Sequence, residues 1–149
     1  MSTPPSPSIA EPLYGASFGQ AIVRFFRKYA TFSGRASRSE YWWWQLATTL
    51  VYLVLAALAL GIGFATGGLN AEGDVFYLSP AFNIGIALAA GWAVVTLIPQ
   101  IAIAVRRLHD VNLSGWLVLL RLLPSVGDVI LLVLTVLPPN PAGARFDKR

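Results

Sequence analysis

Two long stretches without a charged side chain constrain this sequence more than any other feature. No Asp, Glu, Lys or Arg occurs in residues 42–71 or in residues 75–105. A helix of about 20 apolar residues crosses a bilayer, so each stretch is long enough. Only 12% of the chain is charged, about half the roughly 25% of a soluble domain. The sequence therefore predicts an all-α integral membrane protein, with full spans over residues 41–65 and 81–105.

The start of the first span carries a clear helix signal. Ser37 and Glu40 have the spacing of a capping box, in which the Ser side chain and the Glu side chain each bind the other residue's backbone N–H. Tyr41 and three tryptophans follow directly. Because indole and phenol rings favour the headgroup level, these residues predict an aromatic belt at one membrane surface.

The positions of the basic residues predict the orientation of the spans. Two arginines follow the second span, the connecting loop carries only Glu72 and Asp74, and five basic residues precede the first span: Arg24, Arg27, Lys28, Arg35 and Arg38. Cytoplasmic segments carry the excess of Lys and Arg. We therefore expect a multi-pass protein of the bacterial inner membrane with a cytoplasmic N-terminus.

A third apolar segment, residues 114–137, allows two interpretations. It contains Arg121 and Asp128, together with the helix breakers Pro124 and Gly127. One interpretation is a single kinked span. The other is two short helices, 114–123 and 125–137, broken at Pro124, which would return the chain to the cytoplasmic side. The basic residues of the tail slightly favour the second.

The remaining segments complete the expected domain organisation. Residues 1–16 are rich in proline and predict a disordered leader. Residues 18–29 have aromatic side chains on one helical face and cations on the other, which favours an amphipathic helix lying on an anionic leaflet over a helix packed against the protein. We expect one helical membrane domain over residues 17–139, followed by a basic tail over residues 140–149.

The predicted topology brings charged residues of separate motifs to one membrane face. We expect pairing of Glu40 with an arginine of the second span, and of Asp110 with an arginine before the first span. This cluster either only organises the helices or also binds an anionic phospholipid headgroup or a protein partner, since Arg side chains and phosphate form paired hydrogen bonds. Its members are Arg35, Arg38, Glu40, Arg106, Arg107, His109 and Asp110.

Other functional classes have less support in the sequence. The chain has one histidine and no cysteine, and it shows no serine elbow, phosphate loop or metal-ligand cluster. We therefore expect a non-enzymatic protein without a metal or a cofactor. Its net charge of +4 arises beside the spans, so we expect membrane lipids as partners and no nucleic acid. The sequence leaves open whether the chain forms a homo-oligomer or binds a membrane partner. It also leaves open a transporter or channel subunit that uses Arg121 and Asp128.

Two motifs resemble those of a known family. Residues 32–42 read Phe-Ser-Gly-Arg-Ala-Ser-Arg-Ser-Glu-Tyr-Trp, and residues 106–110 read Arg-Arg-Leu-His-Asp, with Ser-Gly-Trp from residue 114. Both resemble the signatures of the bacterial membrane family known as domain of unknown function 805, the YhaH-like proteins. Pro124 and Gly127 also fall where that family has these residue types. The resemblance covers residues 17–146 and implies a small inner-membrane protein with three or four apolar helices and no established activity.

The chain departs from that family at both ends. Family members commonly end in an Asn–aromatic–Gly stretch followed by Asp-Pro, whereas residues 144–147 here read Ala-Arg-Phe-Asp. The Pro-rich leader is an addition. The resemblance therefore assigns no role to the tail or to the leader.

Overall fold

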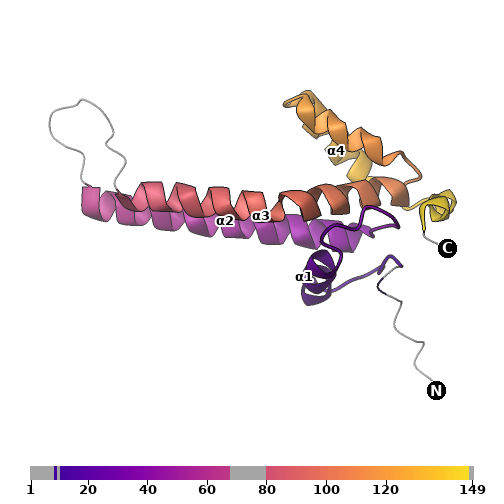
Figure 1. Ribbon diagram of the computed structural model, residues 1–149, viewed down its shortest axis with the longest axis horizontal. Coiled ribbons are helices and arrows are strands. Elements are labelled where there is room, and N and C mark those ends of the chain that lie inside the picture. The colour runs from indigo at the N-terminus through magenta and orange to yellow at the C-terminus, as the bar shows by residue number, and fades with distance from the viewer. Residues whose placement is uncertain (1–8, 10, 68–79, 148–149) are drawn as a thin grey trace, which may run out of the picture. The chain divides into compact units, whose positions relative to one another are not determined.

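The structure, a computed structural model, describes residue 9 and residues 11–67 and 80–147. This part of the chain contains helices and no strand, which confirms the predicted all-helical class. Figure 1 shows the elements in chain order: α1 Phe18–Arg27, α2 Arg38–Gly67, α3 Pro80–Asp110, η1 Gly115–Leu122, α4 Val126–Val136 and η2 Pro141–Phe146.

Helices α2 and α3 are both long and apolar enough to cross a membrane. Their candidate spans are Arg38–Ile62 and Asn83–Asp110, each with a mean hydropathy of 2.0. Only 17% and 22% of their most apolar windows are buried inside the protein. Because a core helix of a soluble protein would bury most of such a window, these helices need an apolar surrounding. Helix α3 also extends beyond the expected end at residue 105, through the Arg-Arg-Leu-His-Asp motif.

The first turn of α2 has the hydrogen bonds that the capping box predicts. The backbone N–H of Glu40 donates to Ser37 Oγ at 3.2 Å, and the N–H of Ser37 donates to Glu40 Oε2 at 2.9 Å. Helix α2 accordingly begins at Arg38. This part of the prediction is confirmed, and it fixes where Glu40 enters the fold.

The chain divides into two compact units, Met1–Gln45 with Ile98–Arg149, and Leu46–Leu97. The second unit holds the later part of α2 and the first part of α3. There, Trp92 Nε1 donates to Thr48 Oγ1 at 3.1 Å, and a Cβ added to Gly85 would lie 2.3 Å from Ala59 Cβ. The small residue at position 85 thus lets two helices of the same chain approach closely. All candidate site residues lie in the first unit.

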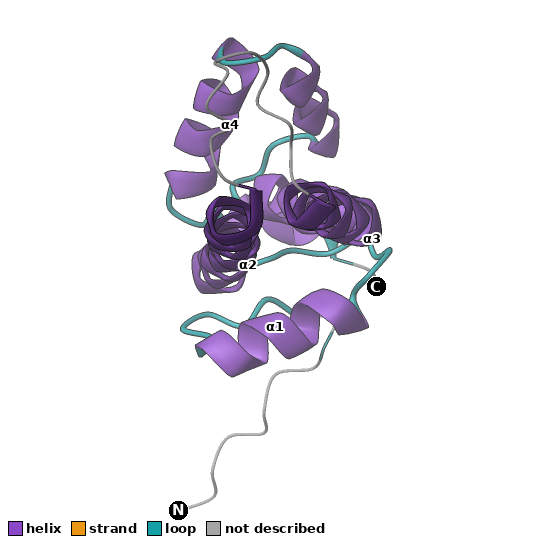
Figure 2. Ribbon diagram, turned by 90° about the vertical axis from the view of Figure 1, so that its left-hand side faces the viewer, coloured by secondary structure: helices purple, strands orange, loops and turns teal. Residues whose placement is uncertain are grey.

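Helix α1 packs crosswise against the beginning of α2 (Figures 1 and 2). Phe25 stacks on Trp44 with an interplanar angle of 12°, and both rings are almost completely buried. Arg24 and Lys28 are buried on the same side, so α1 packs against the protein through the face that carries these two cations. The helical positions explain this, because residues 21, 24, 25 and 28 share one face. The exposed side of α1 carries Phe18, Val23 and Phe26 together with Gln20 and Arg27.

The third apolar segment is interrupted near Pro124. The 3₁₀ helix η1 ends at Leu122, and α4 begins at Val126. Ser125 has a φ of +67°, outside the range of a right-handed helix. A Cβ added to Gly127 would lie 1.7 Å from the carbonyl oxygen of Leu120, so only glycine fits where α4 meets η1. Within residues 114–137 the backbone therefore forms two short helices, η1 and α4.

Candidate functional site

Six charged side chains are buried together in the first unit, and we call this set the charged core. None is more than 8% exposed. Burying charge is costly unless each group finds a partner, so the contacts of each member show what the set does. Among the described residues the core has four cations and two carboxylates: Arg24, Lys28, Arg106, Arg107, Glu40 and Asp110.

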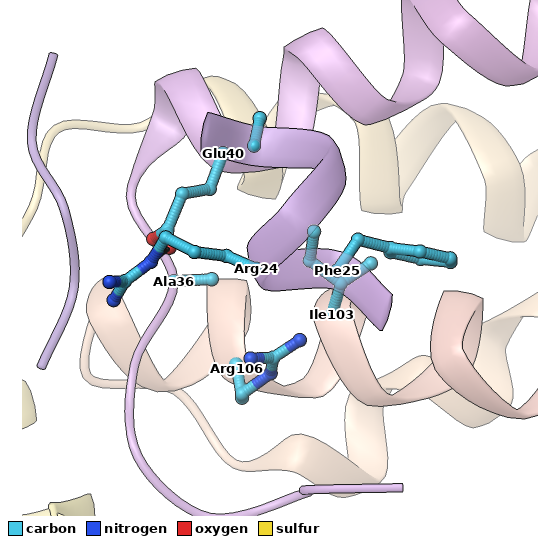
Figure 3. A pocket seen from close by; sticks show the side chains of 7 residues that line it. Arg24, Phe25, Ala36, Glu40, Ile103 and Arg106 are labelled. Atoms are coloured by element: carbon cyan, nitrogen blue, oxygen red, sulfur yellow. Dashed lines mark hydrogen bonds and ion pairs between the residues drawn. The ribbon is translucent and has the colours of Figure 1, made fainter. Parts of the chain in front are cut away.

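The Glu40 carboxylate is held by α1 and by the backbone before α2. Arg24 Nε donates to Glu40 Oε1 in a buried ion pair (Figure 3). The other carboxylate oxygen accepts from the backbone of Ser37 and, at 3.3 Å, from the N–H of Leu13. This pairing differs from the expected one, since Glu40 contacts Arg24 rather than Arg106 or Arg107. The reason is that α1 folds back onto the start of α2.

The end of the predicted leader is part of this site. Arg24 donates to the carbonyl oxygens of Ile9 and Glu11, and Ser37 Oγ donates to the carbonyl oxygen of Leu13 at 2.6 Å. Ser39 Oγ accepts from the N–H of Ala16 at 2.9 Å. Residues 11–16, which we call the N-terminal strap, are therefore ordered by hydrogen bonds, unlike the expected disordered leader. Residues 1–8 and 10 lie outside the described residues.

The second ion pair of the core lies within α3. Arg107 Nη1 donates to Asp110 Oδ2 at 2.5 Å, and both side chains are fully buried. Tyr14 of the strap donates its hydroxyl to Asp110 Oδ1 at 2.7 Å. Burial and this hydrogen bond to Asp110 raise the pKa of Tyr14 to about 12. Asp110 therefore pairs with Arg107 and not, as expected, with Arg35 or Arg38.

Two arginines bind the carboxyl end of α4. Arg107 donates to the carbonyl oxygens of Thr135 and Leu137, and Arg38 Nε donates to the same Leu137 oxygen at 3.1 Å. The last carbonyl groups of a helix lack partners within it and carry partial negative charge. Arg38 and Arg107 satisfy these groups, so the end of α4 is fastened to α2 and α3.

The C-terminal tail also packs onto the first unit. Arg35 forms a two-pronged ion pair with Asp147, with Nη2 and Oδ2 2.7 Å apart. The His109 ring stacks on Phe146 at 4.0 Å between centroids, and its Nδ1 lies 3.1 Å from the carbonyl oxygen of Gly34. Residues 144–147, where the chain departs from the family pattern, thus contact both motifs that carry the resemblance.

The seven cluster residues expected from the sequence all lie in the first unit, but the expected pairings are wrong. Four residues that the structure adds to the site were not predicted: Arg24, Lys28, Tyr14 and Asp147. For Arg24 and Lys28 a signal was present, because they share a helical face with Ala21 and Phe25. For Tyr14 and Asp147 no sequence pattern indicates the contact.

Lys28 and Arg106 differ from the rest of the core. Arg106 donates Nε to the carbonyl oxygen of Ala102 in its own helix at 3.2 Å. Among the described residues, no carboxylate lies within ion-pair distance of Arg106 or of Lys28. The pKa of Lys28 is lowered to about 8, chiefly by burial; the nearby Arg106 and Arg24 contribute to this lowering, while Glu40 and Asp147 act in the opposite direction.

The lowered pKa of Lys28 predicts that stability rises with pH between about 8 and 10. In that range the folded protein has released the Lys28 proton, whereas the unfolded chain, with a pKa of 10.5, still holds it. Above pH 10, Tyr14 acts in the opposite sense because its proton is held more tightly in the folded state. We expect the melting temperature in detergent, followed by tryptophan fluorescence, to rise by a few degrees from pH 7.5 to 9.5.

The Lys28→Met variant should lack this rise, and Arg27→Gln should keep it because Arg27 is exposed. An equal rise in wild type and Lys28→Met would contradict the assignment.

Arg121 and Asp128, the residues of the alternative transporter hypothesis, lie on η1 and α4. Their side chains are 4.0 Å apart and remain 37% and 61% exposed. No group of three or more potential metal ligands occurs among the described residues.

These features define a class: helical proteins with two apolar helices of membrane-spanning length and a charged core at one end of them. The chain belongs to the family described as protein of unknown function (DUF805), which matches residues 29–148. This confirms the resemblance, although the match begins after α1.

Curated relatives are inner membrane proteins. The chain is 33% identical over 114 residues to the inner membrane protein YhaI of Escherichia coli (strain K12), covering 76% of this chain and 80% of YhaI. It is 30% identical over 124 residues to the inner membrane protein YhaH of the same strain, covering 83% of this chain and 90% of YhaH. No solved structure matches the chain.

Proposed function

We propose that this chain is a non-enzymatic, multi-pass inner-membrane protein whose charged core joins the helix ends at the cytoplasmic face and binds anionic phospholipid there. The observation that carries the proposal is the excess of buried cations over carboxylates in the core. An unpaired buried cation is costly, and the headgroups of anionic lipids supply negative charge at the membrane surface.

The exposed surface of α1 supports a position at the membrane interface. Phe18, Val23 and Phe26 are each at least 42% exposed, while the opposite face packs on the protein. Trp42 and Trp43 at the start of α2 are also exposed. Aromatic and apolar side chains of this kind bind at the level of lipid headgroups. Helix α1 would therefore hold the charged core at the depth where lipid phosphates lie.

The segment from η1 to α4 fits a hairpin that enters the membrane and returns. Helix α4 has 11 residues, about half the length needed to span. Its carboxyl end is bound by Arg107 in the last turn of α3, and η1 begins just after α3. Both ends of the hairpin therefore lie near the same end of α3. Its exposed apolar side chains, such as Leu122 and Val129, would contact lipid.

This arrangement predicts that both termini are cytoplasmic. Because the chain has no cysteine, single cysteines can be introduced by Ser2→Cys, Lys148→Cys and Glu72→Cys. A membrane-impermeant maleimide added to spheroplasts should label the Glu72→Cys variant only, and should label all three after the cells are opened. Labelling of Lys148→Cys in closed spheroplasts would instead favour a single kinked third span.

Native mass spectrometry of the full chain, purified in mild detergent from bacterial membranes, tests the lipid proposal. We expect retained phosphatidylglycerol or cardiolipin at a higher ratio to phosphatidylethanolamine than in the source membrane. An unchanged ratio would contradict the proposal. Arg107 is a poor choice for a lipid-binding variant, because its donors already bind Asp110, Thr135 and Leu137.

A further inference from the structure

Two members of the charged core form no ion pair with a carboxylate in the described part of the chain. Lys28 is 4% exposed and Arg106 is 2% exposed. The guanidinium group of Arg106 uses Nε for Ala102, and no carboxylate lies within 4.0 Å of the Lys28 ammonium in the described part of the chain. The other cations of the core, Arg24 and Arg107, each bind a carboxylate and two carbonyl oxygens. The capacity for a ligand therefore lies at Lys28 and Arg106.

A narrow pocket lies beside Arg106, lined by residues of α1, of the start of α2 and of the end of α3. Arg106 lines it together with Arg24, Phe25, Glu40 and Ile103. Figure 3 shows the Glu40 carboxylate against Arg24, with the Arg106 guanidinium apart from that pair. As the side chains stand, the pocket is too narrow for a water molecule. The long side chains of Lys28 and Arg106 therefore have to turn toward the pocket mouth when a ligand binds.

We propose that Lys28 and Arg106 form a binding site for one phosphate group at the contact of α1 with α3. The proposal rests on the proposed function and deepens it, because it names the residues and the chemical group. A guanidinium offers two parallel donors that match two phosphate oxygens, and an ammonium adds a point charge. Glu40 would oppose an anion, but Arg24 neutralises it. The phosphate belongs either to a lipid headgroup or to a free phosphate.

The test uses the full chain in detergent and follows its melting temperature by tryptophan fluorescence. The probes are phosphatidylglycerol, phosphatidylcholine and inorganic phosphate, each titrated at constant ionic strength. A ligand that binds only the folded state raises the melting temperature with its concentration. The variants are Lys28→Met and Arg106→Gln, and the matched control is Arg27→Gln, an exposed cation on the same helix.

For wild type we expect stabilisation by phosphatidylglycerol over phosphatidylcholine. Each of the two variants should need about tenfold more ligand for the same shift, the loss of about one charge-assisted hydrogen bond, while Arg27→Gln should match wild type. Lys28→Met should also melt at a higher temperature than wild type without ligand, because it removes an unpaired buried charge. A variant that merely damaged the fold would melt lower, so this readout separates binding from folding.

The remaining outcomes separate this inference from the proposed function. Stabilisation by phosphatidylglycerol that is equal in wild type and Lys28→Met would overturn the site and leave the lipid proposal intact. Stabilisation by inorganic phosphate alone, lost in both variants, would support the site and overturn the lipid as its source. If neither phosphatidylglycerol nor inorganic phosphate stabilised the wild type, both the phosphate site and the lipid proposal would be overturned.

Discussion

Replacing Asp110 with Asn is expected to lower the free energy of unfolding by about 3–5 kcal/mol, the cost of leaving one charge of a buried ion pair without its partner. Asp110 is the only carboxylate that Arg107 contacts among the described residues, and both side chains are fully buried. Arg107 keeps its carbonyl acceptors at Thr135 and Leu137, but these carry only partial charge. The melting temperature in detergent should therefore fall by about 10 °C or more.

Two control variants separate the ion pair from its surroundings. Tyr14→Phe removes the other hydrogen bond to Asp110 and should cost about 1 kcal/mol. Asp128→Asn changes an exposed carboxylate and should cost less than about 1 kcal/mol. A loss for Asp110→Asn no larger than that for Tyr14→Phe would show that the carboxylate of Asp110 does not support Arg107.

Replacing Glu40 with Gln is expected to cost about 3 kcal/mol or more, because Arg24 loses its only carboxylate within the described residues. Gln can still accept a hydrogen bond from Ser37 or Leu13, which limits the loss. The N-terminal strap should also loosen, since Arg24 and Glu40 together bind the backbone at Ile9, Glu11 and Leu13. Limited proteolysis should then cut before residue 17 faster than in wild type.

A double-mutant cycle identifies the partner of Glu40. The losses of Arg24→Met and Glu40→Gln should not add in the double variant, because the two side chains share one interaction. The losses in free energy of unfolding caused by Arg107→Met and Glu40→Gln should be closer to additive. Strong coupling of Glu40 with Arg107 and none with Arg24 would contradict the structure and restore the pairing expected from the sequence.

Much of the fold follows from the sequence because local rules determine it. Charge-free stretches predict α2 and α3, and the spacing of Ser37 and Glu40 predicts where α2 begins. The break near Pro124 follows from residues that cannot continue a helix. The expected topology also predicts that residues such as Arg35 and Asp110 gather at one end of the helices, because two successive spans would return the chain to the same membrane face.

The pairings within the charged core could not be read from the sequence. They depend on how α1 is turned about its own axis, which packing of Phe25 on Trp44 decides. Arg24 and Ser37 bind the N-terminal segment through its backbone carbonyl oxygens. Because every residue has such an oxygen, the amino-acid sequence does not indicate which ones are used. The pairing of Arg35 with Asp147 joins residues far apart in the chain, and no periodicity connects them.

The hydrogen bonds of Arg38 and Arg107 to the end of α4 can form only late in synthesis of the protein. A ribosome makes Thr135 and Leu137 after both long helices, and Asp147 later still. Until then, Arg107 and Arg35 lack acceptors that they have in the finished chain. In a nascent chain stopped after α3, Arg107 would keep Asp110 but lack the carbonyl oxygens of Thr135 and Leu137, and Arg35 would lack Asp147, so the last part of synthesis supplies the remaining contacts of both arginines.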